Sequence, residues 1–192
     1  MFRDMSQGRT LTPGYAVVYP NREKASSQTT KAIVVVIMLI SVALMLIVTI
    51  GGWSKLQGMK PVNFFWCLAY LIMAFYIGAR WARGLLPIVA ALAILLLIMA
   101  LIAGTGASGT SWFDRSNPGF GQAQTLFGGT GLSPDTLGLV TVLIVPVQVL
   151  LIIFAMVGFS QGWNVEVEVP IEEARRRGYK PAGPPPPQPA AA

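Results

Sequence analysis

Four long apolar stretches dominate this sequence, and none of them contains a charged residue. They cover residues 32–53, 62–79, 85–103 and 137–159. A helix needs about 20 apolar residues to cross the hydrocarbon of a bilayer. All four stretches are apolar around most of the helix circumference, whereas a helix on the surface of a soluble protein is apolar on one face. We therefore expect an all-α membrane protein with four transmembrane helices packed in a bundle.

The composition excludes several classes of soluble protein. Hydrophobic residues make up 54% of the 192 residues and charged residues 11%, whereas a typical soluble domain has about a quarter of its residues charged. A soluble chain of this size has too little interior to bury so much apolar surface. We exclude a disordered chain, an ordinary cytosolic enzyme and, despite the net charge of +6, a soluble nucleic-acid-binding protein.

The distribution of lysine and arginine predicts the orientation, because cytoplasmic loops hold an excess of both residues. With four spans, residues 1–31, the turn at 80–84 and residues 160–192 lie on one side, and they carry eleven of the 14 basic residues. The other side carries three, Lys55, Lys60 and Arg115. We expect a multi-pass plasma-membrane protein with both termini in the cytoplasm.

The spans divide the chain into three parts. Residues 1–31 form a cytoplasmic segment, residues 32–159 the transmembrane domain and residues 160–192 a cytoplasmic tail. Residues 104–136 form a long third loop on the outer side, and loops of this length are usually functional or disordered. Its aromatic residues indicate that part of the loop rests on the bilayer or on a partner. They are Trp112, Phe113, Phe120 and Phe127.

The tail has two local patterns before it becomes rich in proline. Residues 165–169 alternate valine with glutamate, a period of two. Pro170 then stands where a helix can begin, acidic and basic residues follow in turn, and Gly178 stands at the usual stop position. These signals predict one or two turns of helix. The prolines within residues 184–189 predict a polyproline II extension.

The transmembrane interior has no ionisable acid or base to carry chemistry. The four spans contain no Asp, Glu, Lys, Arg or His, and the chain has no histidine at all. Ionisable groups inside a membrane mark proton relays, ion paths and substrate sites. Cys67 is the single cysteine, and in an apolar span we expect it to act as a small hydrophobic residue. We expect no catalytic residue, cofactor or metal. The absence of ionisable residues from the spans argues against a pump, an ion-coupled transporter or an intramembrane protease.

The polar residues of the spans fall largely at one depth. Ser41, Tyr70 and Gln148 lie near the midpoints of the first, second and fourth spans. Pro146 lacks an N–H and is expected to kink its helix by leaving the Val142 carbonyl without its usual partner. The favoured interpretation is packing between helices, worth about 0.6 to 2 kcal/mol for each hydrogen bond. The alternative is a small polar pocket for a quinone or a lipid headgroup.

Small residues recur at helical spacing in the third span. They are Ala90, Ala93, Ala100 and Gly104. Such spacing lets helix backbones approach closely. We expect this row to pack within the four-helix domain, and the alternative is an interface with another subunit.

Two groups of arginines lie next to the predicted spans. The first is Arg80 with Arg83, and the second is Arg175, Arg176 and Arg177. Either group could contact anionic lipid headgroups, at about 1 kcal/mol per charge near the membrane surface. Their effect on topology alone is a sufficient explanation for both groups.

These features favour a non-catalytic membrane protein that acts as an accessory or scaffold subunit of a larger membrane complex. Its expected partners are the lipid bilayer and other membrane subunits, and not nucleic acid. The alternative is a small transporter or channel that forms oligomers around the polar layer. A membrane enzyme is the third choice, because the polar residues outside the spans include no paired catalytic groups and no nucleotide-binding motif.

Overall fold

The computed structural model describes residues 14–105 and 122–180. These residues divide into two compact units, one of residues 29–161 and one that joins the residues up to 28 to those from 162 onward. Arg115, three of the loop aromatics and the proline-rich end lie outside the described residues. Each unit is considered by itself below.

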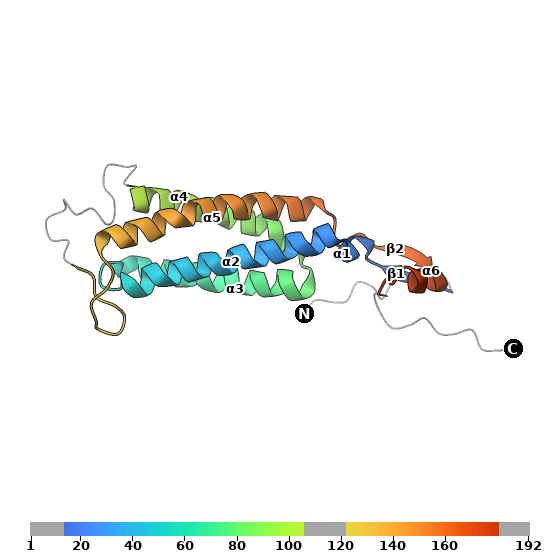
Figure 1. Cartoon of the computed structure of the whole chain (residues 1–192), viewed down its shortest axis with the longest axis horizontal. Coiled ribbons are helices and arrows are strands. Elements are labelled where there is room, and N and C mark those ends of the chain that lie inside the picture. Colours follow the sequence, from blue (N-terminus) through green and yellow to red (C-terminus); the bar gives the residue numbers. More distant parts are fainter. Residues whose placement is uncertain (1–13, 106–121, 181–192) are drawn as a thin grey trace. The chain divides into compact units, whose positions relative to one another are not determined.

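The larger unit is built from four long helices, and the described residues contain four that are long and apolar enough to cross a membrane. They are α2 (Ala25–Gly51), α3 (Lys60–Arg80), α4 (Leu86–Thr105) and α5 (Pro134–Ser160), all visible in Figure 1. Short 3-10 turns, η2 (Gln57–Met59) and η3 (Arg83–Leu85), precede α3 and α4. The prediction of a mostly helical chain with four helices long and apolar enough to cross a membrane is confirmed.

The ends of these helices follow local sequence signals. Ser133 caps α5, because its hydroxyl accepts a hydrogen bond from the Thr136 N–H, and Pro134 occupies the first turn, where no N–H is needed. At the end of α3, Trp81 adopts a left-handed conformation with φ of 53°. Glycine usually holds this position, since it has no Cβ to clash. The Trp81 N–H still closes the helix by donating to the Tyr76 carbonyl.

Helices α4 and α5 pack closely along each other. A Cβ added at Gly104 would lie 2.7 Å from Cγ2 of Val142 on α5, so the absence of a side chain permits this approach. The three alanines of the predicted small-residue row are buried, Ala90, Ala93 and Ala100. The row therefore packs inside this chain, and its buried members are not available to another subunit.

The described end of the loop between α4 and α5, residues 122–133, packs on the end of α2. The N–H groups of Leu126 and Leu132 donate to the carbonyls of Ile50 and Gly51, at 3.3 and 2.9 Å. The last carbonyls of a helix have no partner within it, so the loop satisfies two of them. Ala123 is buried there in a cluster of apolar residues that includes Val48, Leu56 and Leu137. Phe127, by contrast, is 86% exposed.

The smaller unit contains a two-stranded antiparallel sheet, so the expected all-α class is wrong for this part. Strand β1 (Tyr15–Val18) pairs with β2 (Val167–Pro170), with Val18 opposite Val167. The alternating pattern in the tail did signal extended chain, but its partner lies some 150 residues earlier, where no comparable pattern pointed to it. Helices α1 (Pro20–Glu23) and α6 (Ile171–Arg176) complete the unit.

Arg22 joins the two ends of the chain within the smaller unit. Its Nε donates to the Trp163 carbonyl at 3.1 Å, and one terminal nitrogen donates to Asn164 Oδ1 at 2.9 Å. Its guanidinium lies over the Tyr19 ring, whose hydroxyl donates to Glu166. Burial lowers the pKa of Arg22, and the nearby Tyr19 and Glu166 oppose that effect. The arginine thus fixes the N-terminal segment to the start of the tail.

Candidate functional site

The three polar residues near the middle of the spans form one hydrogen-bonded chain. The Tyr70 hydroxyl on α3 donates to Gln148 Oε1 on α5 at 2.8 Å. Gln148 Nε2 donates to the Ser41 hydroxyl on α2 at 2.9 Å, and Ser41 donates to the Ile37 carbonyl at 2.9 Å. All three side chains are 0% exposed. This chain of hydrogen bonds therefore connects α2, α3 and α5 in the interior.

The direction of these hydrogen bonds follows from the Ser41 proton. A serine hydroxyl has one proton, and here it is committed to the Ile37 carbonyl. Ser41 can then only accept from Gln148, which places the amide nitrogen toward Ser41 and the amide oxygen toward Tyr70.

Trp66 lies on α3 one helical turn before Tyr70, the first donor of these hydrogen bonds. Its buried N–H has no hydrogen bond of normal geometry to any described residue. A buried N–H without a partner is unfavourable, by about 1 to 3 kcal/mol. Trp66 was not among the predicted site residues, because an aromatic residue in a span gives no sequence signal of an unpaired donor.

Helix α2 supplies the acceptor hydroxyl in two further pairs of the same kind. Asn63 on α3 donates its amide N–H to Thr49 at 2.9 Å, and Thr49 donates to the Met45 carbonyl at 2.7 Å. Gln161 donates its amide N–H to Thr30 at 2.9 Å. Neither pair was predicted, because the sequence alone does not show which helix faces which hydroxyl. A usable signal was the spacing of Ser41 and Thr49, about two helical turns on one face.

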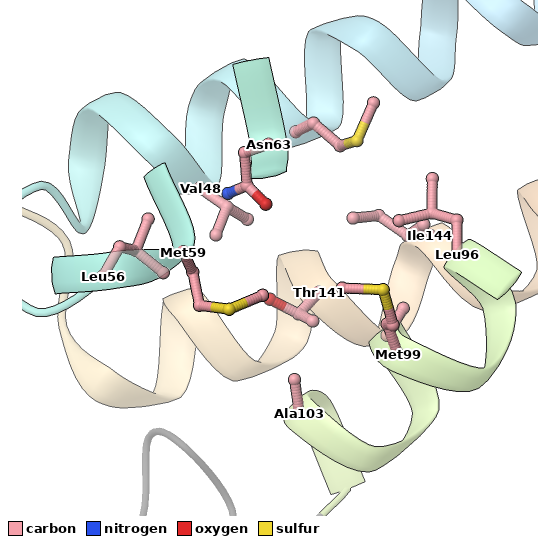
Figure 2. A pocket seen from close by; sticks show the side chains of 11 residues that line it. Val48, Leu56, Met59, Asn63, Leu96, Met99, Ala103, Thr141 and Ile144 are labelled. Atoms are coloured by element: carbon pink, nitrogen blue, oxygen red, sulfur yellow. The ribbon is translucent and has the colours of Figure 1, made fainter. Parts of the chain in front are cut away.

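A half-open pocket lies beside the Asn63–Thr49 pair, among all four long helices (Figure 2). It encloses about 40 Å³. Its lining is apolar apart from Asn63 and Thr141, and three methionines contribute thioethers. The lining residues are Met45, Val48, Leu56, Met59, Asn63, Leu96, Met99, Ala100, Ala103, Thr141 and Ile144. The pocket is distinct from the predicted polar layer, none of whose three residues lines it.

The basic residues at the other end of the larger unit have different surroundings. Arg83 donates from Nε to the Phe159 carbonyl at 2.7 Å, and its guanidinium lies over the Phe159 ring. Lys31 donates to the Gly78 carbonyl at 3.1 Å and lies over the Trp81 ring. Both cations thus neutralise the carbonyl end of a helix. Arg80 is exposed.

The remaining predicted residues lie apart from the polar chain. Arg175, Arg176 and Arg177 are exposed on and after α6, and Arg177 pairs with Glu173 at 2.7 Å. Pro146 faces outward, and α5 continues through it without a break. Cys67 is buried. Of these positions, Cys67 alone places its side chain in the interior.

Comparisons with protein-family models, with curated proteins and with solved structures find no match to this chain.

Proposed function

We propose that this protein is a non-catalytic accessory or scaffold subunit of a larger complex in the plasma membrane, with both termini in the cytoplasm. The observation that carries the proposal is the use of the interior polar groups. The hydroxyl and amide groups of Tyr70, Gln148 and Ser41 form hydrogen bonds to one another and to the Ile37 carbonyl. Such an arrangement stabilises a helical bundle and leaves few interior polar groups to bind or convert a substrate.

The burial of these residues also weighs against the alternative of an oligomeric channel or transporter. That alternative needs the polar layer on the outside of each protomer, where neighbouring copies could build a common path. Ser41, Tyr70 and Gln148 are instead completely buried inside one chain. A neighbouring copy could reach them only if the helices separated and broke the hydrogen bonds between them.

The orientation in this proposal rests on charge. Eleven of the 14 basic residues fall on the side that we assign to the cytoplasm, as the excess of lysine and arginine in cytoplasmic loops requires. The anchoring of Lys31 and Arg83 on helix ends at that side agrees with a boundary between the spans and the headgroups.

Purification in a mild detergent tests the function. A tagged chain is captured from membranes, and the chains that purify with it are identified and quantified, with an untagged strain as the control. A larger membrane protein in fixed stoichiometry is the expected result. A symmetric oligomer of this chain alone that conducts ions or solutes in liposomes would contradict the proposal and favour the channel alternative.

A further inference from the structure

We propose that the pocket between the four helices binds a neutral amphiphile, which places a hydroxyl group against Asn63 and extends its aliphatic chain into the bilayer between α3 and α4. This inference does not depend on the role of the protein as a subunit. It rests on the polar atoms that reach the pocket, on the side at which the pocket opens, and on its depth in the membrane.

The Asn63 amide presents its oxygen to the pocket. Thr49 has one hydroxyl proton, which it donates to the Met45 carbonyl, so Thr49 can only accept from Asn63. The Asn63 nitrogen must therefore face Thr49, and the oxygen must face away. Figure 2 shows this oxygen turned toward the space between the helices. It accepts no hydrogen bond from the residues that the structure describes.

Thr141 completes a pair of acceptors. Its hydroxyl donates to the Leu137 carbonyl at 2.7 Å, so its oxygen retains only lone pairs for a ligand. The two side-chain oxygens of the lining, on Asn63 and Thr141, can thus both accept a hydrogen bond from a ligand. No residue of the lining carries a charge, and a charged headgroup is costly to bury among apolar side chains. A neutral hydroxyl is the donor that fits.

The pocket opens on the side of α3 and α4. Its lining residues on α2 and α5 are almost completely buried, for example Met45 and Ile144. The half-buried members are Met59 at the end of η2, Asn63 near the start of α3, and Met99 on α4. In a membrane this opening faces hydrocarbon, so an aliphatic chain can leave through it without meeting water. Methionine side chains adapt readily to such a chain.

The size and depth of the pocket suit the head of the ligand. A volume of about 40 Å³ accommodates a group of a few heavy atoms, since about 10 to 15 Å³ is enough to hold one water. Met59 and Ala103 stand close to the ends of their helices, next to the loops that leave the membrane. The hydroxyl would thus lie near the headgroup level, where the polar end of an amphiphile normally resides.

Photocrosslinking tests this site with oleyl alcohol that carries a diazirine on its alkyl chain. The full chain is purified in maltoside micelles, irradiated with the probe and digested, and the labelled peptides are identified. We expect labels on the peptides that contain Met59 and Met99. Unlabelled oleyl alcohol should compete about tenfold better than methyl oleate, which has a similar chain without a donor. Equal competition by the two compounds, or no label on these peptides, would overturn the proposal.

Three variants separate binding from stability. Asn63→Leu should abolish the preference for the alcohol over the ester, because it removes the acceptor. Thr49→Val breaks the same hydrogen bond to Asn63 but keeps the amide oxygen, so the preference should persist. Ala103→Leu fills the pocket and should prevent labelling, with gel filtration to show that the variant is folded. Loss of the preference in Thr49→Val to the same extent as in Asn63→Leu would show a structural effect only and would refute the site.

Discussion

Gln148 on α5 donates its amide N–H to the hydroxyl of Ser41 on α2, 2.9 Å away and 107 positions distant in the sequence. The same amide accepts the Tyr70 proton on its other side, so one side chain connects three helices. In hydrocarbon no water can replace these bonds, and a helix that moved away would leave polar atoms without partners. The relationship therefore holds α2, α3 and α5 together at this depth.

Replacement of Gln148 by leucine should lower the stability of the protein in detergent. The change removes both hydrogen bonds and leaves the buried Tyr70 and Ser41 hydroxyls short of a partner, at a cost of about 1 to 3 kcal/mol. Unfolding in detergent measures the effect, and Val149→Leu, at the exposed neighbouring position, is the control. Binding of partner chains should be unchanged. Lost partner binding at unchanged stability would show that Gln148 belongs to a binding site.

Two substitutions by phenylalanine on α3 should differ in whether they remove a hydrogen bond. Tyr70→Phe removes the proton that Gln148 accepts, so it should lower the free energy of unfolding by about 1 kcal/mol. Trp66→Phe removes an N–H that has no hydrogen bond of normal geometry, so it should cost less than the loss of ring volume alone suggests. Unfolding of both variants in the same detergent provides the comparison. A free-energy cost of Trp66→Phe above that expected from the lost ring volume would mean that its N–H has a partner in the membrane.

Arg83 and Arg80 test the value of a cation at a helix end. Both lie at the turn between α3 and α4, and each substitution by methionine removes one positive charge. Arg83→Met also removes the hydrogen bond to the Phe159 carbonyl, so it should destabilise by about 1 to 2 kcal/mol. Arg80→Met, at an exposed position, should change stability by less than about 0.5 kcal/mol. Equal losses in thermal unfolding would contradict a specific role for Arg83.

Gly131 should be intolerant of alanine. A Cβ at this position would press against the Gly51 carbonyl and lie 2.7 Å from the Ala123 carbonyl, so the docked loop would have to move. Gly129→Ala is the matched control, because its Cβ would meet only Thr125 Oγ1 at 3.6 Å. Hydrogen exchange should show faster exchange at the Leu132 N–H, which donates to Gly51, in Gly131→Ala alone. Unchanged protection in both variants would refute the close contact.

Cysteine labelling determines the orientation. In a Cys67→Ala background, a cysteine at Phe127, which is 86% exposed, should react with an impermeant maleimide in intact cells. A cysteine at Gly84, where a side chain has open space, should react only after lysis, because we place the turn at 80–84 in the cytoplasm. The reverse pattern would invert the topology.

The sequence by itself determined the class of this protein, because the length and apolarity of a span are local properties of the chain. It also placed Ser41, Tyr70 and Gln148 at similar depth, since depth follows from counting along each helix. It missed the strand β1, whose pairing with β2 joins segments at opposite ends of the chain. A pairing partner so far away leaves no mark in a short window of sequence.

Only the tertiary structure decided which polar groups meet. In the sequence, Asn63 is one amide near the start of a span and indicates no site. In the structure, Thr49 accepts a hydrogen bond from its nitrogen, and its oxygen faces a pocket. Arg83 likewise indicates only topology in the sequence. The structure shows that it donates to the Phe159 carbonyl at the end of α5. The physical reason is that helix rotation and pairing depend on the sum of many contacts between distant segments, whereas insertion into a membrane depends on each segment almost independently.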